Sequence, residues 1–193
     1  MKDLGVAKLF VGIGVVRDRI QRTIALHQNR YLTNILKLLN MHEANGLFVP
    51  LDPTSRLCSR GGDATKTDAD DSAADIQEDQ KRVGKLVYAM LGTRPDLAYA
   101  VSTLGLFNAD PSYTHAGAVK RTLRYLRRTQ QHVLFYGGLD GGGLDRGLIG
   151  YCDSDWASGP DTRRSTTGYV FNLAGAKISW KSRRQPTVAR SST

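Results

Sequence analysis

Long apolar runs and cysteine are both scarce in this sequence. No stretch of about 18 consecutive apolar residues occurs, so no membrane-spanning helix and no membrane partner are expected. The N-terminal stretch lacks the basic start and the cleavage site of a secretory signal. The two cysteines, Cys58 and Cys152, make neither a disulfide framework nor a zinc-ligand pattern. Together these absences favour a reducing, intracellular setting, either cytoplasmic or nuclear.

What the chain does contain is a globular composition with unevenly distributed charge. Its 193 residues are 40% hydrophobic and 23% charged, which suits one or two ordinary cores. Residues 1–80 hold 10 Lys and Arg against 11 Asp and Glu, whereas residues 81–193 hold 17 against 7. The basic C-terminal part favours a polyanionic partner, and a plain solvated surface is the alternative.

Hydrophobic periodicity predicts an α+β chain. An apolar strand over residues 7–16, a turn over 17–22 and a return strand over 23–28 indicate a β-hairpin. Helical spacing is expected at 29–41, at 76–92, in a helix capped by Thr93, and in a helix that begins after Ser112. Three strands, at 148–153, 167–173 and 177–181, predict an antiparallel meander at the C-terminal end.

Two stretches without periodicity divide the chain. Residues 46–75 are expected to be an acidic flexible linker, because a calcium loop would need spaced oxygen ligands and a closing Glu. Residues 137–147 contain six glycines and predict a tether, since no Lys-Ser or Lys-Thr of a phosphate loop follows. The expected domains are a hairpin with one helix (1–45), the linker, a helical region (76–136), the tether and a strand region (148–193).

The helix after Ser112 has one strongly basic side. Its cations are Lys120, Arg121, Arg124, Arg127 and Arg128. Five positive charges within nine residues repel one another unless an anion lies alongside. A phosphate backbone is one such anion, and bulk solvent around an exposed face is the alternative.

Two further features point to possible sites. Asp153 ends the first strand of the meander and Asp155 follows it, and a carboxylate at the end of a sheet suits a hard cation such as magnesium. The alternative is that Asp155 caps the following turn and Asp153 has no role. Gly12 and Gly14 interrupt the first strand, where glycine weakens pairing unless another backbone comes close.

The chain resembles copia-type retrotransposon Pol polyproteins over nearly its whole length and in the family's order, and the most specific stretches are TRPDLAYAVS, AVKRTLRYL and DSDWASGPDTRRSTTGYVF. The resemblance implies that residues 1–45 are a polymerase-derived hairpin and thumb helix, and that 76–136 are the connection region. It also implies that 148–193 are the N-terminal half of a ribonuclease H domain. An intact protein of this family performs RNA-directed DNA synthesis and, with Mg2+, cleaves the RNA strand of RNA/DNA hybrids.

The resemblance also implies roles for single residues. Asp153 takes the position of a magnesium ligand of the ribonuclease H site, and Asp155 that of a second acid. Residues 9–16 resemble the hairpin that grips the primer terminus, where Gly12 and Gly14 would allow nucleic acid to come close. The basic helix would face duplex nucleic acid or an RNA/DNA hybrid. The rest of the polyprotein would be a further partner.

Departures from the family pattern limit the expected activity. The polymerase's Tyr-x-Asp-Asp is absent, and so is the Glu-Ala-Glu-Tyr that continues the run VARSST in the family. Two-metal cleavage holds its cations about 3.5–4 Å apart, which takes several carboxylates. The chain by itself is therefore expected to be inactive and to bind no magnesium tightly. The alternatives are a non-catalytic nucleic-acid-binding module and a poorly folded translated relic.

Overall fold

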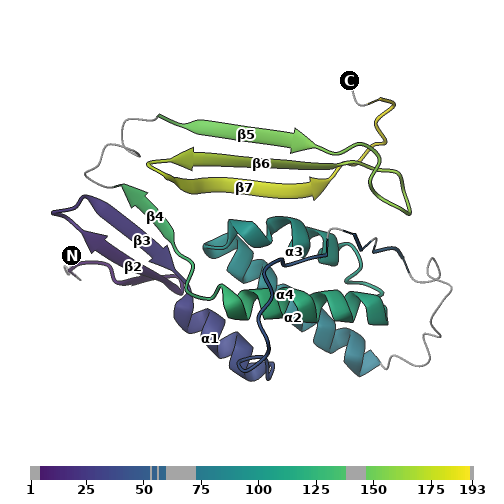
Figure 1. Ribbon diagram of the computed structural model, residues 1–193, viewed down its shortest axis with the longest axis horizontal. Helices are drawn as coiled ribbons and strands as arrows, with labels where there is room; N and C mark the ends of the chain where they lie inside the picture. The colour runs from purple at the N-terminus through teal and green to yellow at the C-terminus, as the bar shows by residue number, and fades with distance from the viewer. Residues whose placement is uncertain (1–4, 53, 56, 60–72, 138–146, 192–193) are drawn as a thin grey trace.

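The computed structural model of this chain describes residues 5–52, 54–55, 57–59, 73–137 and 147–191. Within these ranges the chain has an α+β fold with two antiparallel sheets and a layer of helices (Figure 1). The α+β prediction, with its N-terminal strands, central helices and C-terminal meander, is confirmed. Most of the predicted tether (138–146) and part of the predicted acidic linker (60–72) lie outside the described residues.

The elements follow one another in a simple order. The N-terminal part contains β1 (Leu9–Phe10), β2 (Ile13–Asp18), β3 (Thr23–His27) and α1 (Asn29–Leu38). The middle contains α2 (Ala73–Gly92), the 3-10 turn η1 (Pro95–Leu97), α3 (Ala98–Gly105), α4 (Tyr113–Arg128) and β4 (Leu134–Gly137). The C-terminal part contains β5 (Ile149–Ser154), β6 (Thr166–Leu173) and β7 (Ala176–Arg184).

The first strand differs from the prediction of one continuous strand over 7–16. The chain reverses at Val11 and Gly12, whose φ angles are 46° and 75°, and β1 folds back so that Leu9 lies opposite Gly14 on β2. The hydroxyl of Tyr88 on α2 donates a hydrogen bond of 2.6 Å to the Val11 carbonyl oxygen. A contact 77 residues away in sequence thus helps to fix the turn.

The fourth strand of the N-terminal sheet, β4, follows the four helices in sequence. The strand order is β1-β2-β3-β4, and β4 pairs with β3 from Leu134 opposite Leu26 to Gly137 opposite Thr23. No strand was predicted here, because four residues are too few to show alternation. This pairing links the hairpin to the chain that follows α4.

The helices agree with the apolar periodicity, but one predicted cap is wrong. Ser112 caps α4 in a capping box, and its backbone N–H donates to Nδ1 of His115 at 2.9 Å. Thr93 caps no helix, because η1 begins after Arg94. The Thr93 hydroxyl instead donates to the buried side chain of Gln28, at 3.0 Å from Oε1.

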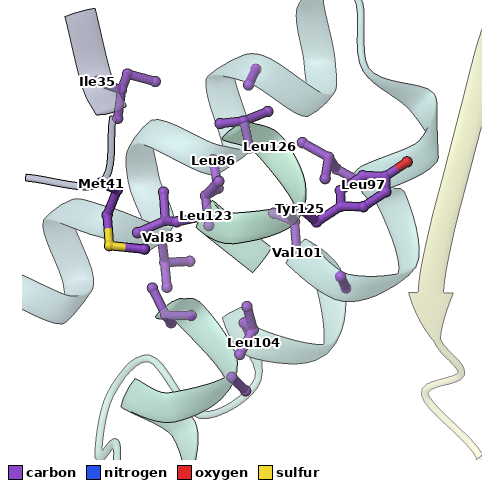
Figure 2. Packing of buried hydrophobic residues seen from close by; sticks show 14 of the residues in the cluster. Ile35, Met41, Val83, Leu86, Leu97, Val101, Leu104, Leu123, Tyr125 and Leu126 are labelled. Carbon is purple, nitrogen blue, oxygen red and sulfur yellow. The ribbon is translucent and has the colours of Figure 1, made fainter. Parts of the chain in front are cut away.

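A single apolar cluster joins the four helices (Figure 2). Leu32, Leu86, Leu97 and Leu126 are completely buried in it. Burying an aliphatic side chain of this size contributes about 1.5–3 kcal/mol, so the cluster is the main source of stability for the helical layer. None of the helices that the structure describes is long and apolar enough to cross a membrane.

The C-terminal sheet is the predicted meander, with the order β5-β6-β7. Three side chains hold β7 against the rest of the chain. The Trp180 indole N–H donates to the Met90 carbonyl at 3.1 Å, and the Ser102 hydroxyl to the Ser182 carbonyl at 2.8 Å. The Tyr136 hydroxyl donates to the carbonyl of Lys177 at 2.7 Å. As Figure 1 shows, β7 is the strand nearest the helices and β5 is the far edge.

Candidate nucleic-acid interface

The structure brings the five predicted cations to one side of α4. At 3.6 residues per turn, Lys120, Arg121, Arg124, Arg127 and Arg128 fall within about a third of the helix circumference. The opposite side is buried and includes Val119, Leu123 and Leu126. We call this set of five cations the basic face.

A segment comprising residues 42–52 crosses the basic face after leaving α1 (Figure 1). The Arg124 Nε–H donates to the Asn45 carbonyl oxygen at 2.7 Å, and the Arg127 Nε–H donates to the His42 carbonyl oxygen. The 42–52 segment therefore supplies acceptors for cations that the sequence left without a partner.

Each of these two arginines uses only its Nε–H in these contacts. A guanidinium has five N–H donors, so its Nη groups keep four. Within the described ranges, the Nη groups of Arg124 and Arg127 have no hydrogen-bond or ion-pair partner. The carbonyls thus orient both side chains and leave them able to bind an anion such as phosphate.

The other end of the basic face contacts the end of the same segment. Arg121 lies 3.8 Å from the Asp52 carboxylate, as measured from Nη1 to Oδ2. Hydrogen bonds from the Thr54 side chain and backbone lower the pKa of Asp52, and the Arg121 charge acts in the same direction. Lys120 has neither a hydrogen bond nor an ion pair with any residue that the structure describes, and its side chain is exposed.

Arg128 lies over an aromatic ring from the 42–52 segment. The centre of its guanidinium is 3.6 Å from the centroid of Phe48, which fits a cation–π contact. Phe48 is 75% exposed. Sequence reasoning missed Phe48, because residues 45–52 have no periodicity and one aromatic in a loop gives no signal.

The two candidate acids have different surroundings. Asp153 lies on β5 opposite Gly168, is exposed, and accepts a hydrogen bond of 2.8 Å at Oδ1 from the backbone N–H of Ser154. Asp155 accepts the Thr166 backbone N–H at 2.7 Å through Oδ1 and the Ser158 hydroxyl through Oδ2. Asp155 therefore closes the turn between β5 and β6, which is one of the two roles that the sequence left open.

A cleft of about 470 Å³ separates these acids from the start of α3. Its lining includes Tyr99, Tyr151, Asp153, Asp155 and a third acid, Asp96. Asp96 is already bound by two residues of the helical layer. Among the residues described, no group of three or more His, Cys, Asp or Glu could hold a metal ion. Asp153 offers a single carboxylate group, and one carboxylate does not fit a paired magnesium centre.

The two candidate glycines lie in the N-terminal sheet, on other elements than the basic face and the acids. Gly12 occupies the turn between β1 and β2, and a Cβ there would be 2.5 Å from the Tyr88 hydroxyl. Gly14 is buried opposite His27, whose ring occupies the place of a Cβ. Neighbours within the chain therefore account for both glycines.

Comparison with known proteins finds relatives of two sizes. The chain is 39% identical over 193 residues to the retrovirus-related Pol polyprotein from transposon TNT 1-94 of Nicotiana tabacum, covering 100% of this chain and 14% of that protein. It is 35% identical over 193 residues to the uncharacterized mitochondrial protein AtMg00810 of Arabidopsis thaliana, covering 100% of this chain and 74% of the relative.

A third relative matches part of the chain. Secreted RxLR effector protein 161 of Plasmopara viticola is 50% identical over 111 residues, which are 58% of this chain and 75% of that protein. No family model and no solved structure matches the chain. The chain thus spans only a small part of the long relative and most of the two short ones.

Proposed function

The chain belongs to the family of copia-type retrotransposon Pol polyproteins, and from this relationship we propose that it is the stretch that runs from the thumb of the polymerase into the first half of the ribonuclease H domain of such a protein. In this proposal the N-terminal sheet and α1 come from the thumb, and α2 to α4 form the connection region. The strands β5, β6 and β7 are the first three of a ribonuclease H domain. The order of elements and the similarity over 193 residues support this.

The proposed role of this stretch is to bind nucleic acid rather than to catalyse a reaction. The observation that supports it is the basic face, in which Arg124 and Arg127 are oriented by backbone carbonyls while their Nη groups keep free donors. Guanidinium groups held in this way suit phosphate oxygens. In the intact polyprotein, the basic face would hold an RNA/DNA hybrid or duplex that other regions act on.

Catalysis is proposed for the intact polyprotein alone. There Asp153 would be one magnesium ligand of the ribonuclease H centre, and other regions would supply the remaining acids and the polymerase aspartates. Within the described residues, Asp96 and Asp155 are committed to hydrogen bonds. We expect that this chain neither extends a primer nor cleaves a hybrid.

The salt dependence of binding tests the proposed interface. Affinity for an RNA/DNA hybrid should fall by about 0.9 log units per log unit of salt for each phosphate neutralised. A variant with Lys120→Ala, Arg124→Ala and Arg128→Ala should show a flatter slope. The matched control replaces three exposed cations on other elements, Arg17, Lys177 and Arg183, with alanine. A slope unchanged by the α4 variant contradicts the proposal.

Because Arg124→Ala also removes a hydrogen bond to Asn45, the thermal unfolding of each variant should be recorded. A second variant, Lys120→Gln with Arg128→Gln, removes two charges and keeps Arg124. A flatter slope in this variant too would assign the effect to charge rather than to unfolding.

A cleavage assay tests the proposed inactivity. The chain, incubated with a labelled RNA/DNA hybrid and magnesium, should release no RNA fragments above background. Asp153→Asn is the control, because it removes the one carboxylate proposed as a ligand. Magnesium-dependent cleavage that disappears in this variant would show that the chain forms a working centre.

A further inference from the structure

We infer that the Phe48–Arg128 pair binds an unpaired nucleobase, so that the basic face binds single-stranded nucleic acid in preference to a closed duplex. This inference rests on the proposed nucleic-acid binding by α4 and adds that a single strand is bound more tightly there than a duplex.

Phe48 is exposed, together with its neighbour Val49, on a stretch that returns to the core at both ends. Met41 and Leu51, on either side of it in sequence, are buried in the core, whereas Phe48 is 75% exposed. Its ring contacts Arg128, itself an exposed side chain on the basic face. A large aromatic side chain that is exposed to solvent beside a cluster of cations offers a flat apolar surface to a ligand.

The backbone around Phe48 is anchored on both sides. The Leu47 N–H donates to the Arg124 carbonyl oxygen at 3.3 Å, and the Pro50 carbonyl accepts the Thr122 hydroxyl at 3.0 Å. Gly46 lies so close to α4 that a Cβ on it would be 2.7 Å from the Cβ of Arg128. The aromatic ring is therefore held in place before a ligand arrives, which lowers the entropy lost on binding.

The charges beside the ring select a polyanion. Arg124 lies about one turn of α4 before Arg128, and Arg127 is the residue next to Arg128. The Nη groups of Arg124 and Arg127 keep free donors for phosphate oxygens. Proteins that bind single strands without sequence preference usually stack the bases on aromatic side chains and bind the nucleic-acid backbone with nearby cationic side chains. In a closed duplex the faces of the bases are stacked on each other, so Phe48 has access to none of them.

The experiment compares single-stranded and duplex oligonucleotides of equal phosphate number, binding to the full chain at fixed salt. The wild type should bind the single strand more tightly. Phe48→Ala should weaken single-strand binding by about ten-fold, within the range for one stacked base, and leave duplex binding within about two-fold. The salt slope should stay unchanged because no charge is lost. Phe48→Trp should keep the wild-type affinity.

Phe135→Ala is the matched control, since it removes another exposed aromatic residue, on β4. This variant should bind like the wild type. Equal losses for single strand and duplex on Phe48→Ala, or no loss at all, overturn the inference and leave the proposed duplex binding intact. If the wild type binds neither form, the inference and the proposed function both fail. Tighter binding of polyglutamate, lost on Phe48→Ala, overturns the inference in favour of an acidic peptide.

Discussion

Arg94 and Asp96 form a two-point ion pair in which the arginine side chain is completely buried. Its Nε donates to Oδ1 at 3.0 Å and its Nη2 to Oδ2 at 2.6 Å. The Arg94 Nη1–H donates to the Thr129 carbonyl at 3.1 Å, and the Tyr125 hydroxyl donates to Asp96 Oδ2 at 2.7 Å. This network joins the start of η1 to the end of α4.

Removing Asp96 should be strongly destabilising. Asp96→Ala leaves the Arg94 guanidinium buried without its anion, and breaking such a pair costs about 3–5 kcal/mol. Urea unfolding measures the change. Lys81→Ala is the control, because Lys81 pairs with Glu78 at 4.0 Å on the surface of α2, where the loss should stay within about 1 kcal/mol. Equal losses in the two variants would contradict the proposed importance of the buried pair.

Stability should fall in acid because of the same carboxylate. Burial raises the pKa of Asp96, but the hydrogen bonds and charge of Arg94 and the hydrogen bond from Tyr125 outweigh burial and lower it. The contribution is complete above the unfolded pKa of about 3.9 and disappears as the pH falls through the lower folded-state pKa. Asp96→Asn should flatten this limb of a plot of unfolding free energy against pH. An unaltered limb would assign the acid sensitivity to other groups.

The fall of the unfolding free energy at alkaline pH, which is the alkaline limb of its plot against pH, should depend on Tyr125. Burial raises the pKa of this phenol, and the hydrogen bond to Asp96 raises it further. Its contribution is complete below the unfolded pKa of about 10 and is lost as the pH rises through the folded-state pKa. Tyr125→Phe should flatten this limb in denaturant titrations above about pH 10. Part of the limb should remain, because burial also raises the pKa of Tyr31, and Tyr31→Phe should remove that part.

Substituting Gly12 should disturb the hairpin turn. At a φ of 75° an L-residue is strained, and the added Cβ would meet the Tyr88 hydroxyl. Gly12→Ala should lower the unfolding free energy by about 1 kcal/mol or more. Gly84→Ala is the control, because Gly84 lies on α2 with open space around it and alanine there should add about 0.5–1 kcal/mol. Thermal unfolding compares the two, and stabilisation by Gly12→Ala would refute this account of the turn.

Gly46→Ala should push the 42–52 segment away from α4. The new Cβ would lie 2.7 Å from the Arg128 Cβ and 3.3 Å from its Cα, and such overpacking costs about 1–3 kcal/mol. Gly117→Ala is the matched control, because Gly117 lies on α4 with open space around it, and this variant should not destabilise the chain. Chemical denaturation measures both. Hydrogen exchange should also become faster at the Leu47 amide, which donates to the Arg124 carbonyl.

Some elements could be predicted from the sequence because local residues determine them. The apolar spacing from Leu32 to Leu36 gave α1, and Ser112 marked the start of α4. The turn at Val11 could not be predicted, because the hydroxyl that binds its carbonyl belongs to Tyr88. Threonine is a residue type suited to capping, but the Thr93 hydroxyl donates to the side chain of Gln28, which lies between β3 and α1. In both cases a distant contact overrides the local pattern.

The candidate site was predictable to a similar degree. The five cations were predicted on one side of a helix because helical spacing alone determines that side. The 42–52 segment that crosses them was not predicted, because main-chain acceptors such as the His42 and Asn45 carbonyls leave no trace in residue types. Phe48 was not predicted either, because a single aromatic residue in a stretch without periodicity gives no signal. That Asp153 ligates magnesium and that the basic face binds nucleic acid remain predictions.

The acceptors that bind Arg124 and Arg127 are peptide oxygens, which every amino acid supplies. Exchanging the side chains of His42 or Asn45 leaves those oxygens in place, whereas inserting or deleting one residue between them would change their spacing, so that the two oxygens no longer match the two guanidinium groups. The number of residues in this part of the 42–52 segment is therefore constrained more tightly than their types. Substitutions can accumulate at His42 and Asn45 while the two guanidinium groups keep their orientation.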